Sequence, residues 1–158
     1  MKYIFLDIDG VLNCDNTTQR CCGMPGIDPE CLKHLKYIVE QTHACIVLTS
    51  TWKYYWDSAG TPGMEEMCFY LNTQFMSEGL KIIDRTEDMG YDRGQGIIDF
   101  LICHPSNAWV VLDDEFFGDY EVLGIRNHLV LTGQDGLTHE HAIQAINILK
   151  EELQETST

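Results

Sequence analysis

Hydrophobic positions along the chain follow two periods in turn, one typical of buried strands and the other of amphipathic helices. Short, nearly continuous apolar runs predict strands, and apolar residues spaced three and four positions apart predict helices. Asp28 followed by Pro29 is a strong helix start, because aspartate caps free N–H groups and proline fits the first helical position. The strand pattern occurs at 3–8, 45–49, 80–83, 108–112 and 128–131, and the helix pattern at 29–41, 64–75, 95–103 and from about Thr138 onward.

This alternation of strands and helices predicts an α/β fold, a Rossmann-like three-layer α/β/α sandwich around a five-stranded parallel sheet. The sequence contains no linker and no internal repeat, so we expect a single domain over residues 1–158 with its core at about 3–153. Ligands of such sheets bind beyond the carboxyl ends of the strands. Polar residues that gather just after several strands should therefore share one site.

Polar groups do follow three of the predicted strands, and a fourth group begins the third predicted helix. One such group could arise by chance, whereas four at equivalent positions indicate a common site. The groups are Asp7-Ile8-Asp9-Gly10, Thr49-Ser50-Thr51-Trp52, Asp113-Asp114-Glu115 and Asp92-Arg93-Gly94.

The acidic residues of these groups predict a metal site. Asp7 and Asp9 point to the same side if the chain stays extended, and Asp113 arrives from a neighbouring strand. Three carboxylates close together repel one another unless they are protonated or neutralised by a cation. Mg²⁺ prefers oxygen ligands and also binds phosphate oxygens. The electrostatics therefore suggest a phosphate that Mg²⁺ bridges to the protein.

The other polar residues suit phosphoryl transfer. Thr49 and Ser50 offer hydroxyl donors, and Arg93 offers a fixed cationic fork that matches phosphate. An aspartate can attack phosphorus to form an aspartyl-phosphate, and a second carboxylate can move the proton. Gly10 allows the backbone to turn sharply beside a ligand.

Composition narrows the choice of partner and compartment. The chain has 10 basic and 25 acidic residues, a net charge of −15, so we do not expect extended nucleic-acid binding. A nucleotide or a strand end held at one local site stays compatible with this charge. No apolar run approaches the roughly 20 residues of a membrane span, and no signal peptide precedes the first strand, so we expect a cytoplasmic protein. The seven cysteines, an odd number, are expected to be reduced thiols.

The order of the motifs resembles that of the haloacid dehalogenase (HAD) superfamily of phosphotransferases. FLDIDGVLN is similar to its first motif, IVLTS to its second and VVLDDE to its acidic fourth. Its third motif is a lysine or arginine upstream of the fourth, for which Arg93 is the first candidate and Lys81 the reserve. LTSTW, RGQGIIDFL and LVLTGQDGLT are also similar to a small branch that includes the HAD domain of Swiss Army Knife RNA repair proteins, and the resemblance covers about residues 3 to 150.

The resemblance implies a HAD-like fold with strand order 5-4-1-2-3, numbered along the chain, and Mg²⁺-dependent phosphomonoester hydrolysis through an aspartyl-phosphate. Asp7 would be the nucleophile and a Mg²⁺ ligand. Asp9 would be the general acid/base and would bind the metal through its backbone carbonyl. Asp113 would ligate Mg²⁺, with Asp114 a ligand directly or through water.

The resemblance also implies residues that hold the phosphorylated substrate. Thr49 would hold a phosphoryl oxygen, and Arg93 would offset the charge of the phosphoaspartate. That small branch often has a basic residue just after the tryptophan, which Lys53 matches. The expected substrate-binding residues are Gly10, Ser50, Trp52 and Lys53.

Insertions called caps set substrate choice in this family, and here they are short. Residues 14–27 leave room for a small flap and residues 53–79 for a loop and one helix. The site should therefore be open, which fits a phosphate on a macromolecule or a small substrate covered from elsewhere. Residues 52–56, which include two tryptophans and two tyrosines, either pack under the loop, the interpretation we favour, or form a wall that stacks a ring.

Several alternatives stay open. The same fold would suit a nucleic-acid end-processing phosphatase of the RNA repair type, which the aromatic run supports and the net charge opposes. It would also suit a non-catalytic module that binds a metal or a partner, which the intact Asp7 and Asp9 oppose. The D-x-D pattern occurs in glycosyltransferases as well, and Arg93 could form a surface ion pair with Asp92 or Asp88. The sequence predicts neither the substrate nor the oligomeric state.

Overall fold

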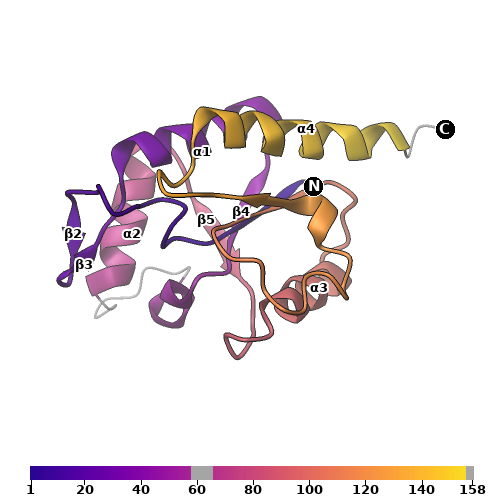
Figure 1. Ribbon diagram of the computed structural model, residues 1–158, viewed down its shortest axis with the longest axis horizontal. Helices are drawn as coiled ribbons and strands as arrows, with labels where there is room; N and C mark the ends of the chain where they lie inside the picture. Colours follow the sequence, from indigo (N-terminus) through magenta and orange to yellow (C-terminus); the bar gives the residue numbers. More distant parts are fainter. Residues whose placement is uncertain (58–65, 156–158) are drawn as a thin grey trace.

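Five parallel strands form the central sheet of the protein (Figure 1). The computed structural model describes residues 1–57 and 66–155, without the side chains of 152–155. The sheet order β5-β4-β1-β6-β7 is the predicted order read from the opposite edge, so the predicted fold class and topology are confirmed. The strands are β1 (Tyr3–Leu6), β4 (Cys45–Leu48), β5 (Ile82–Arg85), β6 (Trp109–Asp113) and β7 (Leu129–Leu131).

Four α-helices connect and cover these strands, close to the predicted positions. The third begins at Arg93, two residues before the predicted start, and positions 64 and 65 of the second predicted helix lie outside the described residues. No helix in the described ranges is long and apolar enough to cross a membrane. The helices are α1 (Pro29–Thr42), α2 (Glu66–Ser77), α3 (Arg93–Cys103) and α4 (His139–Glu155), with short 3₁₀ helices η1 (Thr51–Tyr55) and η2 (Arg126–His128).

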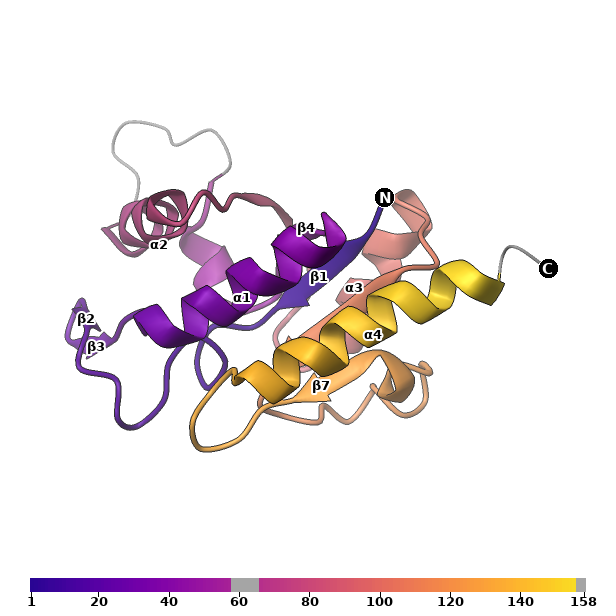
Figure 2. The ribbon, with the colours of Figure 1, turned by 90° about the horizontal axis from the view of Figure 1, so that it is seen from above.

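Helix α1 shows how the local sequence sets an element. The Asp28 carboxylate accepts a hydrogen bond from the Glu30 N–H at 2.9 Å, and Pro29 occupies the first position, as predicted. The helix ends at Thr42, where His43 adopts a left-handed conformation with φ of 57°. The buried face of α1 then packs along α4 above the sheet (Figure 2).

Alternate side chains of the three central strands enter two hydrophobic clusters, one on each face of the sheet. Ile4 and Leu6 of β1 pack on the face covered by α1, α2 and α4. Tyr3 and Phe5 pack on the other face, against α3 and the segment that follows β6. Figures 1 and 2 show these three layers, with α1 and α4 together on one side and α3 on the other.

The expected flap at residues 14–27 contains a small antiparallel hairpin. Its strands β2 (Arg20–Cys21) and β3 (Met24–Pro25) are joined by Cys22 and Gly23, with φ values of 53° and 78°. Two successive residues of positive φ form the tight turn that suits a two-residue hairpin. The Ile27 N–H just after the hairpin donates to the Tyr70 hydroxyl of α2 at 2.9 Å.

All seven cysteines are free in the structure, in agreement with the reduced thiols expected from the sequence. Cys21 and Cys31 are buried, and burial is the main cause that raises the pKa of these two thiols, to about 11 and about 12. A raised thiol pKa favours the protonated, unreactive form.

Candidate acidic active site

The register of the three central strands brings their ends to one level. Leu6 of β1 pairs with Leu48 of β4 and with Leu112 of β6. The next residues along these strands are Asp7, Thr49 and Asp113, and the Asp7 N–H donates to the Leu112 carbonyl at 3.0 Å. Because side chains alternate along a strand, residues that follow Leu6 and Leu112 turn toward the face covered by α3.

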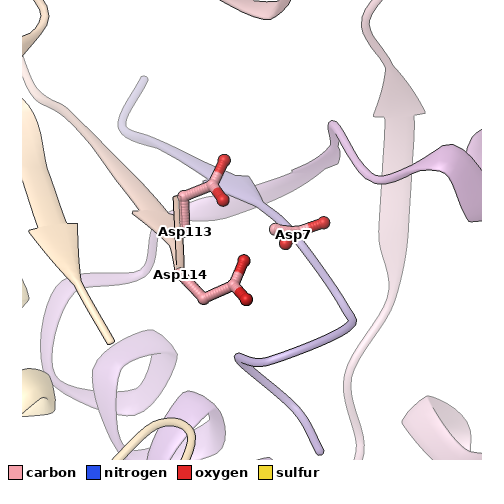
Figure 3. Close-up of side chains that lie close together, drawn as sticks. All are labelled: Asp7, Asp113 and Asp114. Atoms are coloured by element: carbon pink, nitrogen blue, oxygen red, sulfur yellow. The ribbon is translucent and has the colours of Figure 1, made fainter. Parts of the chain in front are cut away.

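Asp7, Asp113 and Asp114 form an acidic cluster at this edge (Figure 3). One carboxylate oxygen from each residue lies within 4.8 Å of the others. Asp7 and Asp113 are buried, whereas Asp114 is exposed. Burial raises the pKa of Asp7 well above its ordinary value, and the charge of Asp113 adds to this; burial also raises the pKa of Asp113. The cluster therefore favours a cation that removes the repulsion.

Gly10 makes room for this cluster. Its φ is +82°, and a Cβ at this position would lie 2.2 Å from Asp114 Oδ2. The Thr132 hydroxyl fixes the turn by donating to the Gly10 carbonyl at 2.7 Å. A larger residue at position 10 would both strain the backbone and displace the Asp114 carboxylate.

Arg93, the first residue of α3, lies against the buried acids. Its Nη1 is 3.2 Å from Asp7 Oδ1 and 3.0 Å from Asp113 Oδ2. Its guanidinium group lies 4.3 Å from the centre of the Phe117 ring. Burial acts to lower the pKa of Arg93, but the carboxylates of Asp7 and Asp113 outweigh this and raise it overall. Lys81, the other candidate for this position, is exposed just before β5.

Two buried polar atoms at this edge of the sheet, outside the acidic cluster, lack a hydrogen-bond partner within the part of the chain that the structure describes. They are the Thr49 hydroxyl and Arg93 Nε, on side chains that are 1% and 6% exposed. A buried polar group without a partner is costly and marks a place where a ligand can supply one. Arg93 Nε can only donate, and the Thr49 hydroxyl can donate or accept, so a ligand with acceptor atoms would satisfy both.

Tyr120 supports Asp113 from the segment after β6, a role that the sequence analysis did not foresee. Its fully buried hydroxyl donates to Asp113 Oδ2 at 2.9 Å, the oxygen that also faces Arg93. Asp119 accepts hydrogen bonds from the Gly94 and Gln95 N–H groups at the start of α3, at 3.1 and 2.9 Å. The segment therefore fixes both the acid and the helix that carries Arg93.

The sequence analysis grouped the carboxylates of Asp7, Asp9 and Asp113. In the structure Asp114, and not Asp9, is the third carboxylate of the cluster. The chain leaves the extended conformation after Ile8, whose carbonyl accepts from the Val11 and Leu12 N–H groups at 3.0 and 2.8 Å. The exposed Asp9 carboxylate instead accepts from Trp52 Nε1 at 3.2 Å and from Asn13 Nδ2 at 3.0 Å.

The residues after β4 divide into buried and exposed groups. Ser50 caps η1, its hydroxyl accepting from the Trp52 N–H at 3.3 Å. Trp52 and Trp56 are buried in the core, as the favoured interpretation of the aromatic run predicted. Tyr54 and Tyr55 are 51% and 50% exposed. Among the described residues of this run, the exposed aromatic side chains are therefore the two tyrosines.

Lys53 is buried and paired. Its ammonium group forms an ion pair with Asp88 and donates to the Thr86 hydroxyl at 3.2 Å. Thr86 also donates to the Asp88 carboxylate at 3.3 Å, and the Gly90 N–H donates to Asp88 at 2.8 Å. Burial lowers the pKa of Lys53 despite the charge of Asp88. Lys53, Thr86 and Asp88 therefore serve as partners for one another.

The donor set of the acidic cluster suits a hard divalent cation. It offers only carboxylate oxygens, two of them on buried side chains, and such ligands favour Mg²⁺ over softer metals. Asp7, Asp113 and Asp114 are the residues that would hold the ion. Sheet order, acidic cluster and paired arginine together define a HAD-like Rossmannoid domain with an acidic site at the carboxyl edge of its sheet.

Comparison with known families agrees with this class. The family model described as the HAD domain in Swiss Army Knife RNA repair proteins matches residues 3–142. The chain therefore belongs to this family, and the resemblance that the motifs carry is confirmed. Searches of curated proteins and of solved structures gave no significant match.

Proposed function

We propose that the protein is a Mg²⁺-dependent phosphomonoester hydrolase that works through an aspartyl-phosphate on Asp7. One observation carries this proposal. The buried Asp7 carboxylate lies within reach of Asp113, Asp114 and Arg93, beside the unpartnered Thr49 hydroxyl. Acidic ligands for a cation and free donors for an anion thus lie at one strand end, an arrangement that suits a phosphate held between them.

Mg²⁺, when bound, supplies positive charge that offsets both the carboxylates and the phosphoryl oxygens. Asp7, Asp113 and Asp114 would hold the ion. Thr49 and the Nε of Arg93 would donate to phosphoryl oxygens. Tyr120 and Arg93 keep the Asp113 carboxylate in one orientation, so the ligand set is largely preformed.

The first chemical step forms the covalent intermediate. An oxygen of the Asp7 carboxylate attacks phosphorus as the bond between phosphorus and the ester oxygen breaks. The leaving oxygen takes a proton from Asp9 and departs as an alcohol. Arg93, which pairs with Asp7 before the reaction, stays beside the same oxygen atoms and offsets their charge.

The second step regenerates the enzyme. A water molecule gives a proton to the Asp9 carboxylate and attacks phosphorus, and the bond between phosphorus and the Asp7 oxygen breaks. Inorganic phosphate leaves, Asp7 is again a carboxylate, and Asp9 carries the proton for the next cycle. Each of the two aspartates in D-x-D therefore has a separate task.

Hydrolysis of an aryl phosphate tests this proposal. We expect turnover by the wild type in Mg²⁺ and none after chelation of the metal. Asp7→Asn should lower kcat on the order of 10⁴-fold or more, because the amide cannot serve as the nucleophile. Wild-type turnover that survives chelation, or unchanged turnover in the Asp7→Asn variant, contradicts the proposal. A folded protein that binds Mg²⁺ without turnover of any phosphate ester would instead be a binding module.

A second candidate is removal of phosphate from nucleic-acid ends, favoured by the RNA repair proteins for which the family is named. The half-exposed Tyr54 and Tyr55 offer ring faces on which bases could stack. The net charge of −15 opposes binding along a strand but allows contact with an end. A terminally phosphorylated oligonucleotide should then be hydrolysed with higher kcat/KM than the matching free nucleotide. Equal values would favour small substrates.

A further inference from the structure

The two oxygens of the Asp9 carboxylate are held separately. Oδ2 accepts from the indole N–H of Trp52 at 3.2 Å, and Oδ1 accepts from the side-chain amide of Asn13 at 3.0 Å. Asp9 itself is exposed, whereas Trp52 and Asn13 are only 3% and 4% exposed. An exposed acid is thus oriented by two partners that the core immobilises.

Trp52 is fixed by its surroundings. It belongs to the hydrophobic cluster beneath α1 and α2, and it is the second residue of η1, whose start is capped by Ser50. Its backbone N–H donates to the Ser50 hydroxyl at 3.3 Å. The indole cannot turn away from Asp9 without leaving a void in a close-packed core.

The amide of Asn13 is fixed as well, and its orientation is unambiguous. Its Oδ1 accepts from the Gly10 N–H at 2.9 Å, which requires an acceptor. Its Nδ2 donates to the Gly26 carbonyl at 3.0 Å, which requires a donor. The same nitrogen therefore presents an N–H to Asp9.

We propose that Trp52 and Asn13 are positioning residues that hold the Asp9 carboxylate where the leaving oxygen of the substrate departs. This role rests on the proposed function, in which Asp9 moves the proton. An oxygen of a carboxylate has about two acceptor sites, so one N–H on each oxygen leaves a second site for the proton. Neither the indole nor the amide can take that proton, so the pair orients Asp9 without competing with it. Trp52 thus acts from beneath the site, not as a ring that stacks the substrate.

The effect of the leaving group tests this role. An alkyl phosphate has a poor leaving group that needs a proton as it departs, whereas dinitrophenyl phosphate departs without one. The ratio kcat/KM reports only the steps through the first irreversible one, here transfer of the phosphoryl group to Asp7. Loss of proton transfer should therefore lower kcat/KM for the alkyl ester and spare the dinitrophenyl ester.

Trp52→Phe keeps an aromatic ring in the core but removes the indole N–H together with part of the ring system, so its control must lose the same volume. Trp56→Phe is the matched control, because Trp56 is also buried and its N–H donates to Asn72 Oδ1 at 3.0 Å instead of to Asp9. Asp9→Asn removes proton transfer altogether and should lower kcat/KM for the alkyl ester by about 10²-fold to 10⁴-fold. We expect Trp52→Phe to lower the same value between about 10-fold and about 100-fold. The dinitrophenyl ester should change little in every variant, and Trp56→Phe should match the wild type.

An equal loss on both esters in Trp52→Phe, or no loss on either, overturns the role of Trp52. If Asp9→Asn itself treats the two esters alike, the proposed function fails first. The NMR signal of the Trp52 indole N–H separates these cases, because it reports the contact without any turnover. It should shift in Asp9→Ala while the Trp56 signal stays in place. A Trp52 signal that does not move shows that the contact with Asp9 is absent.

Discussion

Arg93 and Lys53 are both buried cations near the carboxyl edge of the sheet, yet their partners differ. The Lys53 ammonium group is shared between Asp88 and Thr86, which also bond to each other. One Arg93 nitrogen lies between Asp7 and Asp113, and its Nε has no hydrogen-bond partner within the described residues. Burial lowers the pKa of Lys53; for Arg93 burial acts in the same direction, but the two carboxylates outweigh it.

The two buried charges therefore have different roles in this protein. The partners of Lys53 form a closed group, so the lysine ties η1 to the loop after β5. The partners of Arg93 are the acids that we propose as Mg²⁺ ligands beside the phosphate. The Nε of Arg93 remains available to donate to a ligand. We therefore expect loss of Arg93 to affect catalysis and loss of Lys53 to affect stability.

Arg93→Gln should have the largest effect of this comparison, on turnover. Removal of one preorganised cationic donor should lower kcat by about 10²-fold to 10³-fold. Arg93→Lys should recover part of this loss, because the charge returns without the fork. Steady-state hydrolysis of an aryl phosphate measures both variants. Wild-type kcat in Arg93→Gln would contradict the assignment of Arg93 to the phosphoryl group.

Lys53→Met should instead lower the free energy of unfolding, by about 3–5 kcal/mol, because Asp88 stays buried without its cation. Urea denaturation measures this change. The double variant Lys53→Met with Asp88→Leu should recover much of the loss, since the uncompensated charge is gone. A folded Lys53→Met protein with normal stability and no turnover would reverse the comparison. It would give Lys53 the substrate contact that the sequence analysis predicted.

Removal of Mg²⁺ should distinguish the residues of the acidic cluster from the Lys53 group. At about 100 times its dissociation constant, the ion should raise the free energy of unfolding by about 2.7 kcal/mol. Denaturation with Mg²⁺ or with a chelator measures this gain in each variant. Lys53→Met should keep it and Asp113→Asn should lose it, because only the latter removes a ligand of the acidic cluster. The same gain in Asp113→Asn would place the ion elsewhere.

His128, directly before the amino-terminal end of β7, should give the smallest change in stability. Its ring stacks on Trp109 with centroids 3.5 Å apart, and burial lowers its pKa. The unfolded chain then binds the proton more readily than the folded protein, so the contribution of His128 to stability should fall as pH drops through about 6.5. His128→Phe keeps the stacking and should reduce this loss by about 1 kcal/mol or less. Denaturation at pH 7.5 and at pH 5.5, about one unit on each side of the ordinary histidine pKa, measures this loss of stability. Part of the pH dependence should remain in His128→Phe, because burial also lowers the pKa of His34.

Sequence patterns were sufficient for the sheet and for the residues at the ends of its strands. Strand periodicity is a local property, and the carboxyl ends of parallel strands meet at one edge, so Asp7 and Asp113 could be placed together from the sequence alone. The position of Arg93 near the start of α3 followed from the same logic, because a helix that leads into β6 begins at the carboxyl edge, although the helix begins two residues before the predicted start.

The contacts that orient these residues could not be predicted in the same way. Trp52 meets Asp9 across 43 positions of sequence, and Lys53 meets Asp88 across 35. Tyr120 lies in a segment without regular periodicity, so nothing in the local pattern marks its hydroxyl as a partner of Asp113. Such contacts depend on how loops cross the sheet edge, which apolar periodicity does not encode.

Direct detection of a phosphoryl group on Asp7 tests the central claim. The wild type and Asp9→Asn are mixed with dinitrophenyl phosphate and Mg²⁺ and quenched in acid, and any acyl phosphate is reduced with borohydride. We expect mass spectrometry to find residue 7 reduced to homoserine, with more of it in Asp9→Asn because water is then activated poorly. Turnover with an unlabelled Asp7, or with the label on another residue, would contradict the account.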